Sequence, residues 1–291
     1  MVMYTYGKTS SIRFYKKGKV AIGSLIMSLE NDGKKWTWEE TLLAFDLYSR
    51  IEYSKISVSH REIIHLAELL KRKPGAVTKK LYNIASHDPK QIDRGRKALP
   101  HSSKFDKRVW EEFEVNPEST VYEATKELAA RENKNVDYIV DTETSHLIVE
   151  AFPYGEDREA ATKIRVGQAY FRKAILSAYN NQCCITGINE KRLLVASHIK
   201  PWSISDKETE RVNPRNGLCL NALHDKAFDR GLLTVTPNYE VLISSKLRET
   251  QMDDNTKTWF YSYEHTKICL PDKFKPDKEY LEYHNEVVFL H

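Results

Sequence analysis

The chain has 291 residues, 41% of them hydrophobic, which is enough for two ordinary domains with their own cores. Its net charge of +4 is only mildly basic, so it permits a nucleic-acid partner without arguing for one. Four cysteines with no C-x-x-C pair exclude a disulfide framework and a four-thiolate zinc site, and they favour a reduced, cytoplasmic compartment. The apolar run at 20–29 is too short to cross a bilayer, so we expect no membrane partner.

Three helical patterns follow one another in residues 36–86. The first begins at Thr37, a good N-cap residue. The second covers about 61–70, and Pro74-Gly75 separates it from the third, at about 76–86. This layout resembles the helix-turn-helix readers of the Myb/SANT-like and winged-helix classes, while a purely structural bundle stays open as the alternative.

Positive charge gathers on the third helical pattern and beyond it. Residues 71–108 contain 12 Lys or Arg against 3 Asp or Glu, in a chain whose overall balance is nearly even. A run of charge is usually a solvated face, but this one covers the segment expected to read DNA. We therefore predict that four residues of this segment contact phosphates: Lys71, Arg72, Lys79 and Lys80. Lys79 and Lys80 are expected on the exposed side of the third helix.

The middle of the chain predicts two further helices, at about 107–114 and 119–131. Short apolar runs at 138–140 and 147–149 suggest a hairpin, and a long helix then runs to about Tyr179. We divide the chain into an N-terminal extension (1–35), a helical, DNA-binding-like domain (36–116), a connecting region (117–154) and a second domain (155–291).

The second domain contains a predicted β–β–α unit. Residues 193–199 are apolar and bounded by turns, so they predict a strand with the polar His198 near its end. Residues 217–220 predict a returning strand, directly after Asn216. Asn221 is a good N-cap and Gly231 a good residue just past a helix end, so a helix of about nine residues is expected between them. The expected fold class is α+β.

The polar residues of this unit suit phosphodiester hydrolysis. His198 can take a proton from water because an imidazole titrates near neutral pH. Asn216 can give a neutral oxygen to a metal ion, or it can hold the base in position. Asp225 and Asp229 stand four residues apart, on one helix face, and offer the oxygen ligands that hard divalent ions prefer. His224 also suits a softer ion such as zinc or manganese.

Four motifs of this region resemble the HNH endonuclease family, and more closely a bacterial subgroup found among restriction endonucleases. They are C-x-x-T-G, A-S-H-I-K-P-W, N-P-R-N-G-L and H-D-K-A-F-D-R-G. The resemblance implies a ββα-metal fold in which His198 is the general base, Asn216 an orienting or coordinating amide, and His224 a metal ligand. It extends from about residue 165 to the end, and residues 36–110 resemble the segment that often accompanies this nuclease module.

The sequence departs from the family pattern in two places. Many members carry Asp or His directly before the base as a metal ligand, and here that position is Ser197. The family's zinc-holding C-x-x-C pairs are absent, and Cys183 and Thr186 stand where one pair would be. The missing ligand favours Asp225 or Asp229 as ligands of the ion.

The expected function is metal-dependent hydrolysis of double-stranded DNA, in restriction or in defence against foreign DNA. Mg²⁺ or Mn²⁺ is the expected ion, with Zn²⁺ as an alternative. Arg165 and Arg172 are further candidates for phosphate contact. A homodimer is favoured if both strands are cut, because one ββα site cuts one strand. Two alternatives stay open: a DNA-binding regulator whose nuclease fold no longer cuts, and an RNA-directed or toxin-like nuclease.

Overall fold

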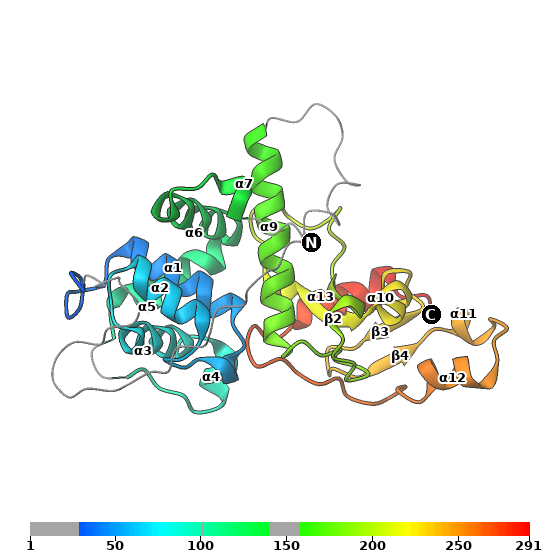
Figure 1. The fold of residues 1–291 in the computed structure, drawn as a ribbon. Coiled ribbons are helices and arrows are strands. Elements are labelled where there is room, and N and C mark those ends of the chain that lie inside the picture. The colour runs from blue at the N-terminus through cyan, green and yellow to red at the C-terminus, as the bar shows by residue number, and fades with distance from the viewer. Residues whose placement is uncertain (1–28, 100–101, 140–157) are drawn as a thin grey trace, which may run out of the picture.

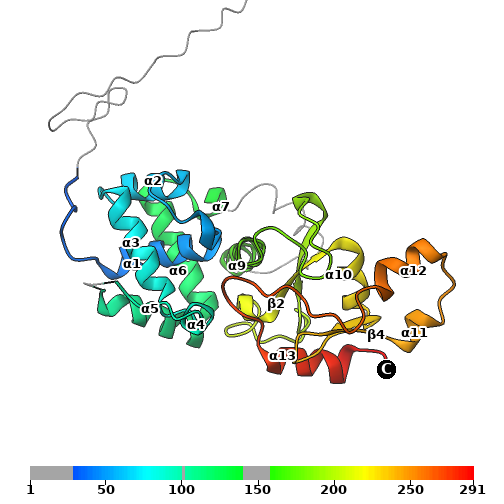
Figure 2. The ribbon, with the colours of Figure 1, turned by 90° about the horizontal axis from the view of Figure 1, so that it is seen from below.

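The structure, a computed structural model, describes residues 29–99, 102–139 and 158–291. Within these residues the chain forms two groups of elements on either side of one long helix, α9 (Arg158–Ala178), as Figures 1 and 2 show. The predicted long helix before Tyr179 is thereby confirmed. Most of the predicted N-terminal extension lies outside the described residues.

The group that precedes α9 is a helical bundle. Its α1 begins at the predicted N-cap Thr37, whose hydroxyl accepts from the Glu40 N–H while the Glu40 carboxylate accepts from the Thr37 N–H. The helices predicted from periodicity are all present: α1 (Trp38–Arg50), α2 (Arg61–Leu69), α3 (Pro74–Ala85), α5 (Lys104–Val115) and α6 (Pro117–Glu132), with a short α4 (Pro89–Asp93) between α3 and α5. Phe45 packs on Trp110 and Phe113 at the centre of this bundle, which also takes in α6.

The segment after α6 differs from the prediction. Residues 138–140 were expected to begin a hairpin, but Tyr138 and Ile139 belong to a helical turn, α7 (Val136–Ile139). The Asn135 side chain accepts from the Asp137 N–H and so starts this turn, which overrides the apolar pattern of a strand. The predicted partner strand at 147–149 lies outside the described residues.

The group that follows α9 is built on two short antiparallel hairpins. β1 (Leu194–His198) pairs with β2 (Gly217–Asn221), and β3 (Leu233–Val235) pairs with β4 (Val241–Ile243). The helices of this group are α10 (Ala222–Asp229), α11 (Ser245–Arg248), α12 (Asp254–Tyr261) and α13 (Lys278–Tyr283), the last continuing into a turn of π-helix (His284–Val288). Phe171 and Ile175 of α9 belong to the core of this group.

The two groups are fastened to each other through α9 and a C-terminal segment. Val166 and Tyr170 of α9 belong to the core of the bundle, one helical face away from Phe171. The buried Lys273 ammonium donates to the carbonyls of Tyr48, Ser49 and Ile51, at the end of α1. Because the last carbonyls of a helix have no partner within it, this lysine caps α1 from the other group.

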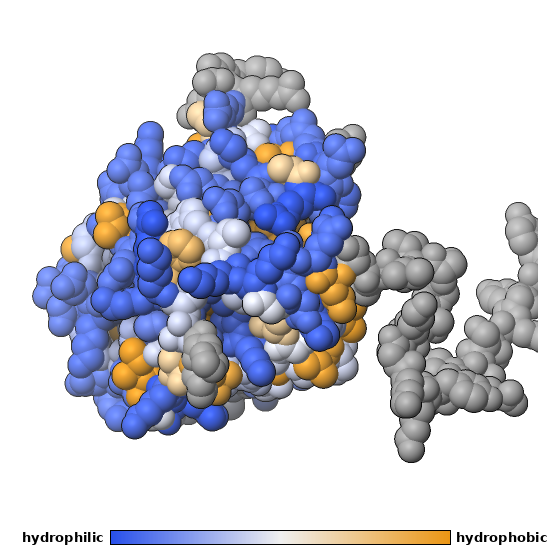
Figure 3. All heavy atoms as spheres, turned by 90° about the vertical axis from the view of Figure 1, so that its left-hand side faces the viewer, coloured by the Kyte–Doolittle hydropathy of each residue, from blue (hydrophilic) through white to orange (hydrophobic). Residues whose placement is uncertain are grey.

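The outer face of the bundle is mainly hydrophilic, with apolar side chains in separate small patches (Figure 3). None of the helices in the described ranges has the length and apolar character that a membrane crossing requires.

Candidate active site

The predicted β–β–α unit is present, and its termini form for the predicted reasons. β1 and β2 pair in a register that sets His198 opposite Gly217. The Asn221 side chain accepts from the N–H groups of Leu223 and His224 and caps α10. Gly231 ends the helix with a φ of +67°, and a Cβ there would collide with the Val288 carbonyl. Both requirements restrict this position to glycine.

His198 is held on two sides. Its ring lies parallel to that of Phe171, with centroids 3.8 Å apart, and its Nε2 lies 2.9 Å from the carbonyl oxygen of Arg211. A carbonyl only accepts, so Nε2 carries the proton and the neutral ring keeps its lone pair on Nδ1. Burial lowers the pKa of His198 to about 4. The ring is therefore neutral at pH 7, the form that a proton acceptor needs.

Asn216 is fully buried, and its side-chain amide forms hydrogen bonds with the loop that follows β1. Its Oδ1 accepts from the Lys200 N–H at 2.8 Å, and its Nδ2 donates to the Ser205 hydroxyl at 3.2 Å and more weakly to the carbonyls of Lys200 and Glu210. A Lys200–Glu210 ion pair closes the same loop at 2.6 Å. This loop carries the Arg211 carbonyl, so Asn216 positions the partner of His198 and does not face an open site.

Two carboxylates share one face of α10, as the four-residue spacing predicts. Burial, and then the charge of Asp229, raises the pKa of Asp225 to about 6. The pKa of Asp229 is also raised, chiefly by loss of solvent around its carboxyl. The Asp225 carboxyl lies near the Ser197 hydroxyl, whose oxygen has no hydrogen bond of normal geometry within the described part of the chain. Adjacent strand residues face opposite sides, so Ser197 turns to α10 while His198 turns to α9.

His224, predicted as a catalytic residue and metal ligand, lies in a different setting. It is fully buried, its Nε2 lies 3.0 Å from the Trp259 carbonyl, and its Nδ1 lies 2.9 Å from the Asn221 amide. Both ring nitrogens thus form hydrogen bonds within the protein. Neither is available in this structure to bind a metal ion together with Asp225. In this structure the side chain fastens α12 to the N-terminus of α10.

Comparison with known families gives this unit a match. Residues 183–236 match the family model HNH_2, described as HNH endonuclease. This segment is similar to HNH endonucleases, and we call it the HNH segment. The match spans β1, β2 and α10, and it includes His198, Asn216 and Asp225. No curated protein matches the chain.

Hydrogen bonds connect four polar side chains of the HNH segment. The Asn221 amide lies 3.2 Å from the Thr186 hydroxyl and 3.6 Å from the Cys183 thiol, in addition to its contact with His224. Cys183 and Thr186 stand where one C-x-x-C pair would be, and Asn221 and His224 have the same x-x spacing. Hydrogen bonding among these four side chains, which we call the knuckle quartet, joins the two turns of the HNH segment.

The predicted phosphate-contacting residues divide into buried and exposed ones. The expectation that Lys80 is exposed is wrong: it is 2% exposed and forms an ion pair with the buried Asp106. Arg72 is also 2% exposed, bound to Glu40 at 2.7 Å. Buried in ion pairs, neither cation can reach a DNA phosphate here. Lys71 and Lys79 are exposed, although Lys71 pairs with Glu30 at 2.7 Å.

The two predicted arginines of α9 have partners in the protein. Arg165 forms an ion pair with Asp137 at 2.7 Å. Arg172 donates to the carbonyl of Leu194, the first residue of β1, and no carboxylate pairs with it in the ranges that the structure describes. Arg172 therefore supports the strand that carries His198.

Sequence reasoning missed three groups that shape the site: the Phe171 ring, the Arg211 carbonyl and the Trp259 carbonyl. Phe171 lies within a stretch that resembles the family, yet its stacking on a histidine 27 residues later follows only from the packing of α9 on β1. The two carbonyls carry no side-chain signal, so no residue type could have marked them.

Proposed function

We propose that the protein is a divalent-metal-dependent endonuclease that hydrolyses duplex DNA, with a role in restriction or in defence against foreign DNA. One observation carries the proposal. Within the HNH segment a neutral, half-buried imidazole, His198, has one nitrogen fixed by a carbonyl, and a carboxylate pair stands beside the neighbouring Ser197. Among the described residues, nothing bonds to the other nitrogen of His198.

The carboxylate pair fits a hard divalent cation. A bound cation would relieve both the burial of Asp225 and its repulsion by Asp229, which together raise its pKa. No group of three or more His, Cys, Asp or Glu side chains gathers for a metal in the described ranges. This agrees with Mg²⁺, which is usually held by one or two carboxylates, with water and substrate phosphate completing its shell. Such an ion, when bound, stabilises negative charge on phosphate oxygens during displacement.

The chain's own residues supply the proton transfer. His198 accepts a proton at Nδ1 from the water that attacks phosphorus, and it becomes an imidazolium whose Nε2–H stays bonded to the Arg211 carbonyl. Asn216 keeps that carbonyl in place through the loop. The family resemblance implies products with a 5′-phosphate and a 3′-hydroxyl.

Exposed cations support contact with DNA from both groups of elements. Lys79 on α3 is exposed and has no ion pair within the described part of the chain. Lys226 on α10 and Arg230, the residue directly after that helix, are exposed beside the acidic pair. Long-range attraction to phosphates would bring the duplex to these residues, and the acidic pair would face the strand through its metal ion.

The test compares the wild type with His198→Ala on supercoiled plasmid in Mg²⁺ and in Mn²⁺, with the ends of the products mapped. We expect a loss of nicking of at least about 10³-fold, because a positioned base contributes about 10²–10⁴-fold, and unchanged affinity for duplex DNA. His65→Ala, a surface histidine of α2, is the matched control and should cut normally. Nicking by His198→Ala at the wild-type rate would contradict the assignment.

A second candidate is a DNA-binding regulator that no longer cuts. Ser197 at the usual ligand position and the engaged nitrogens of His224 favour it. Metal-dependent cleavage by the wild type would exclude it. Parallel digests of duplex DNA, single strands and RNA separate the RNA-directed or toxin-like alternative, and native mass spectrometry tests the expected homodimer.

A further inference from the structure

Much of the positive charge that the sequence places in residues 71–108 is neutralised by the protein itself. Of the 12 Lys and Arg side chains in this segment, seven form ion pairs with carboxylates. Five form no ion pair within the part of the chain that the structure describes: Lys79, Lys90, Arg96, Lys97 and Lys104. Three of these five lie on α4 or directly after it, so the unpaired charge is concentrated there.

The loop that ends α4, Arg94-Gly95-Arg96-Lys97, has a fixed backbone, and we call it the basic loop. Gly95 has a φ of +73°, and the N–H groups of Gly95 and Arg96 donate to carbonyls of α4 at 2.8 and 3.0 Å. This is the Schellman arrangement, which favours glycine at the left-handed position. Further along, the Leu99 N–H donates to Oδ1 of Asn83 on α3 at 2.9 Å. The cations of the basic loop therefore extend from a backbone that is held on both sides.

The basic loop lies at the end of the bundle that adjoins the second group of elements (Figures 1 and 2). Arg94 contacts the Asp272 carboxylate at 2.5 Å, and the Gln91 amide donates to the Asp272 carbonyl at 2.6 Å. Residues 89–99 contain four cations and one carboxylate, that of Asp93. With Asp272 counted as well, four positive charges meet two negative ones, so this surface keeps an excess of two positive charges.

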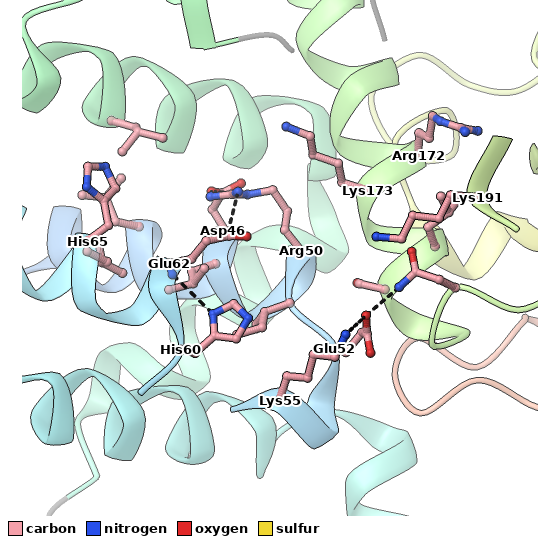
Figure 4. A pocket seen from close by; sticks show the side chains of 18 of the residues that line it. Asp46, Arg50, Glu52, Lys55, His60, Glu62, His65, Arg172, Lys173 and Lys191 are labelled. Carbon is pink, nitrogen blue, oxygen red and sulfur yellow. Dashed lines mark hydrogen bonds and ion pairs between the residues drawn. The ribbon is translucent and has the colours of Figure 1, made fainter. Parts of the chain in front are cut away.

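The cavity between the bundle and α9 shows how cations with partners differ from those of the basic loop. It has a volume of about 1010 Å³, and Arg50 and Lys55 are in its lining (Figure 4). Arg50 contacts a carboxylate of the same lining at 2.6 Å, and Lys55 contacts another at 2.8 Å. Arg96 and Lys97 do not line this cavity and are exposed. Exposed cations on a protruding loop suit an extended polyanion better than a small enclosed anion.

We propose that the basic loop binds the phosphate backbone of duplex DNA, with Arg96 and Lys97 each meeting one phosphate. This inference rests on the proposed function, because it takes duplex DNA as the partner. Guanidinium and ammonium groups form charge-assisted hydrogen bonds with phosphate oxygens, and a fixed loop loses little conformational freedom when it binds. Contacts of this kind fix the position of a duplex without reading its sequence. The basic loop thus anchors DNA at the junction of the two groups of elements.

The experiment measures binding of the full chain to a short fluorescent DNA duplex by anisotropy, with EDTA present so that nothing is cut. Between about 50 and 200 mM salt, the logarithm of the binding constant should fall linearly with the logarithm of the salt concentration, by about 0.9 for each phosphate contact. Arg96→Ala with Lys97→Ala should make this slope shallower by about 2 and weaken binding at least about 10-fold. The loss should be the same for duplexes of unrelated sequence, because phosphates carry no sequence information.

Two further variants separate a local contact from a general effect of charge. Lys126→Ala with Lys134→Ala removes two exposed cations on and just after α6, which lies away from α4 in Figure 1, and it should keep the wild-type slope. Arg96→Lys should also keep the slope, because an ammonium group still binds a phosphate.

The proposal is overturned if the wild type does not bind the duplex, or if Arg96→Ala with Lys97→Ala keeps the wild-type slope. It is also overturned if the α6 variant changes as much, or if the loss concerns an RNA duplex or anionic vesicles and not DNA. Failure of the proposed function has a different signature. The wild type would then bind plasmid DNA with the expected salt dependence and leave it uncut in Mg²⁺ and in Mn²⁺.

Discussion

The ring of His198 lies flat on the ring of Phe171, with centroids 3.8 Å apart and planes inclined by 8°. The stack fixes the plane of the imidazole, and the bond from Nε2 to the Arg211 carbonyl fixes its rotation within that plane. Together these two contacts leave Nδ1 pointing in one direction. The imidazole is therefore held in one orientation, as the proposed role of base requires.

Phe171→Leu tests the importance of this stack. Leucine preserves apolar volume but not a flat surface, so the imidazole gains freedom to tilt. We expect single-turnover cleavage to fall about 10- to 100-fold, the loss typical of small misplacements of a reacting group. Phe260→Leu changes a phenylalanine of the same core that does not touch His198, and it should cleave nearly as the wild type does. Equal losses in both variants would contradict the specific role of Phe171.

Gly217→Ala tests the close approach of α9 to β2. A Cβ at Gly217 would lie 2.5 Å from Cδ1 of Ile175 and 2.7 Å from Cζ of Phe171, so these buried side chains, or α9 itself, must shift. Overpacking of this kind costs about 1–3 kcal/mol of unfolding free energy, which urea unfolding measures. Gly75→Ala is the matched control. Gly75 lies in helix α3, and a Cβ there would meet nothing closer than 4.0 Å, so this substitution should raise the unfolding free energy by about 0.5–1 kcal/mol. A neutral Gly217→Ala would show that α9 can shift without cost.

Lys273→Met tests the capping of α1 from the C-terminal segment. The substitution removes the Lys273 donor from three carbonyls at the end of α1, of which only Ser49 keeps another, the Ser177 hydroxyl, and we expect a loss of about 3 kcal/mol in unfolding free energy. Asp272→Asn, the neighbouring position, keeps the donor in place and should cost less.

The same lysine predicts a pH dependence. Burial lowers the pKa of Lys273 to about 7, while an unfolded chain titrates near 10.4. Between these values the unfolded state binds the additional proton, so this group makes unfolding free energy rise as the pH rises from 7 to about 10. Urea unfolding of the wild type at pH 7, 8 and 9 should show this rise more strongly than Lys273→Met. Parallel pH profiles of the two proteins would count against a buried titrating lysine.

The knuckle quartet predicts that zinc binding can be restored. Thr186→Cys with Asn221→Cys adds two thiolates to Cys183 and His224, which is a Cys₃His ligand set for zinc. The double variant should bind one zinc ion per chain, measured by elemental analysis, and its melting temperature should fall when a chelator is added. Thr186→Ala with Asn221→Ala is the control and should contain no zinc. Stoichiometric zinc in the wild type would contradict the hydrogen-bonded interpretation.

Local chemistry made much of the HNH segment predictable. The apolar run before His198, the N-cap Asn221 and the terminating Gly231 each act within a few residues, so β1, β2 and α10 follow from sequence. The domain boundaries and the roles of individual site residues stay predictions. The general-base role of His198 rests on the family resemblance together with the geometry around its ring.

Long-range packing decided what sequence could not. Lys80 lies on the buried side of α3 because Asp106 of α5 meets it there, 26 residues later in the chain. The Nε2 of His224 is hydrogen-bonded because α12 packs beside it and brings the carbonyl of Trp259, 35 residues later in the chain, within reach. Neither partner is visible in the periodicity of a single helix, so burial of a charged residue could not be anticipated from its own segment.

The end of α10 has a consequence for the order in which the protein is completed. Gly231 accepts from the Leu290 N–H, and His284 stacks on Phe228 while its Nε2 bonds to the Phe228 carbonyl. These partners are synthesised more than fifty residues after the helix that they secure. During translation the bundle can fold first, while the helix that carries Asp225 is secured only once residues 284–290 have emerged. Folding of this helix thus depends on a segment far downstream of it in the order of synthesis.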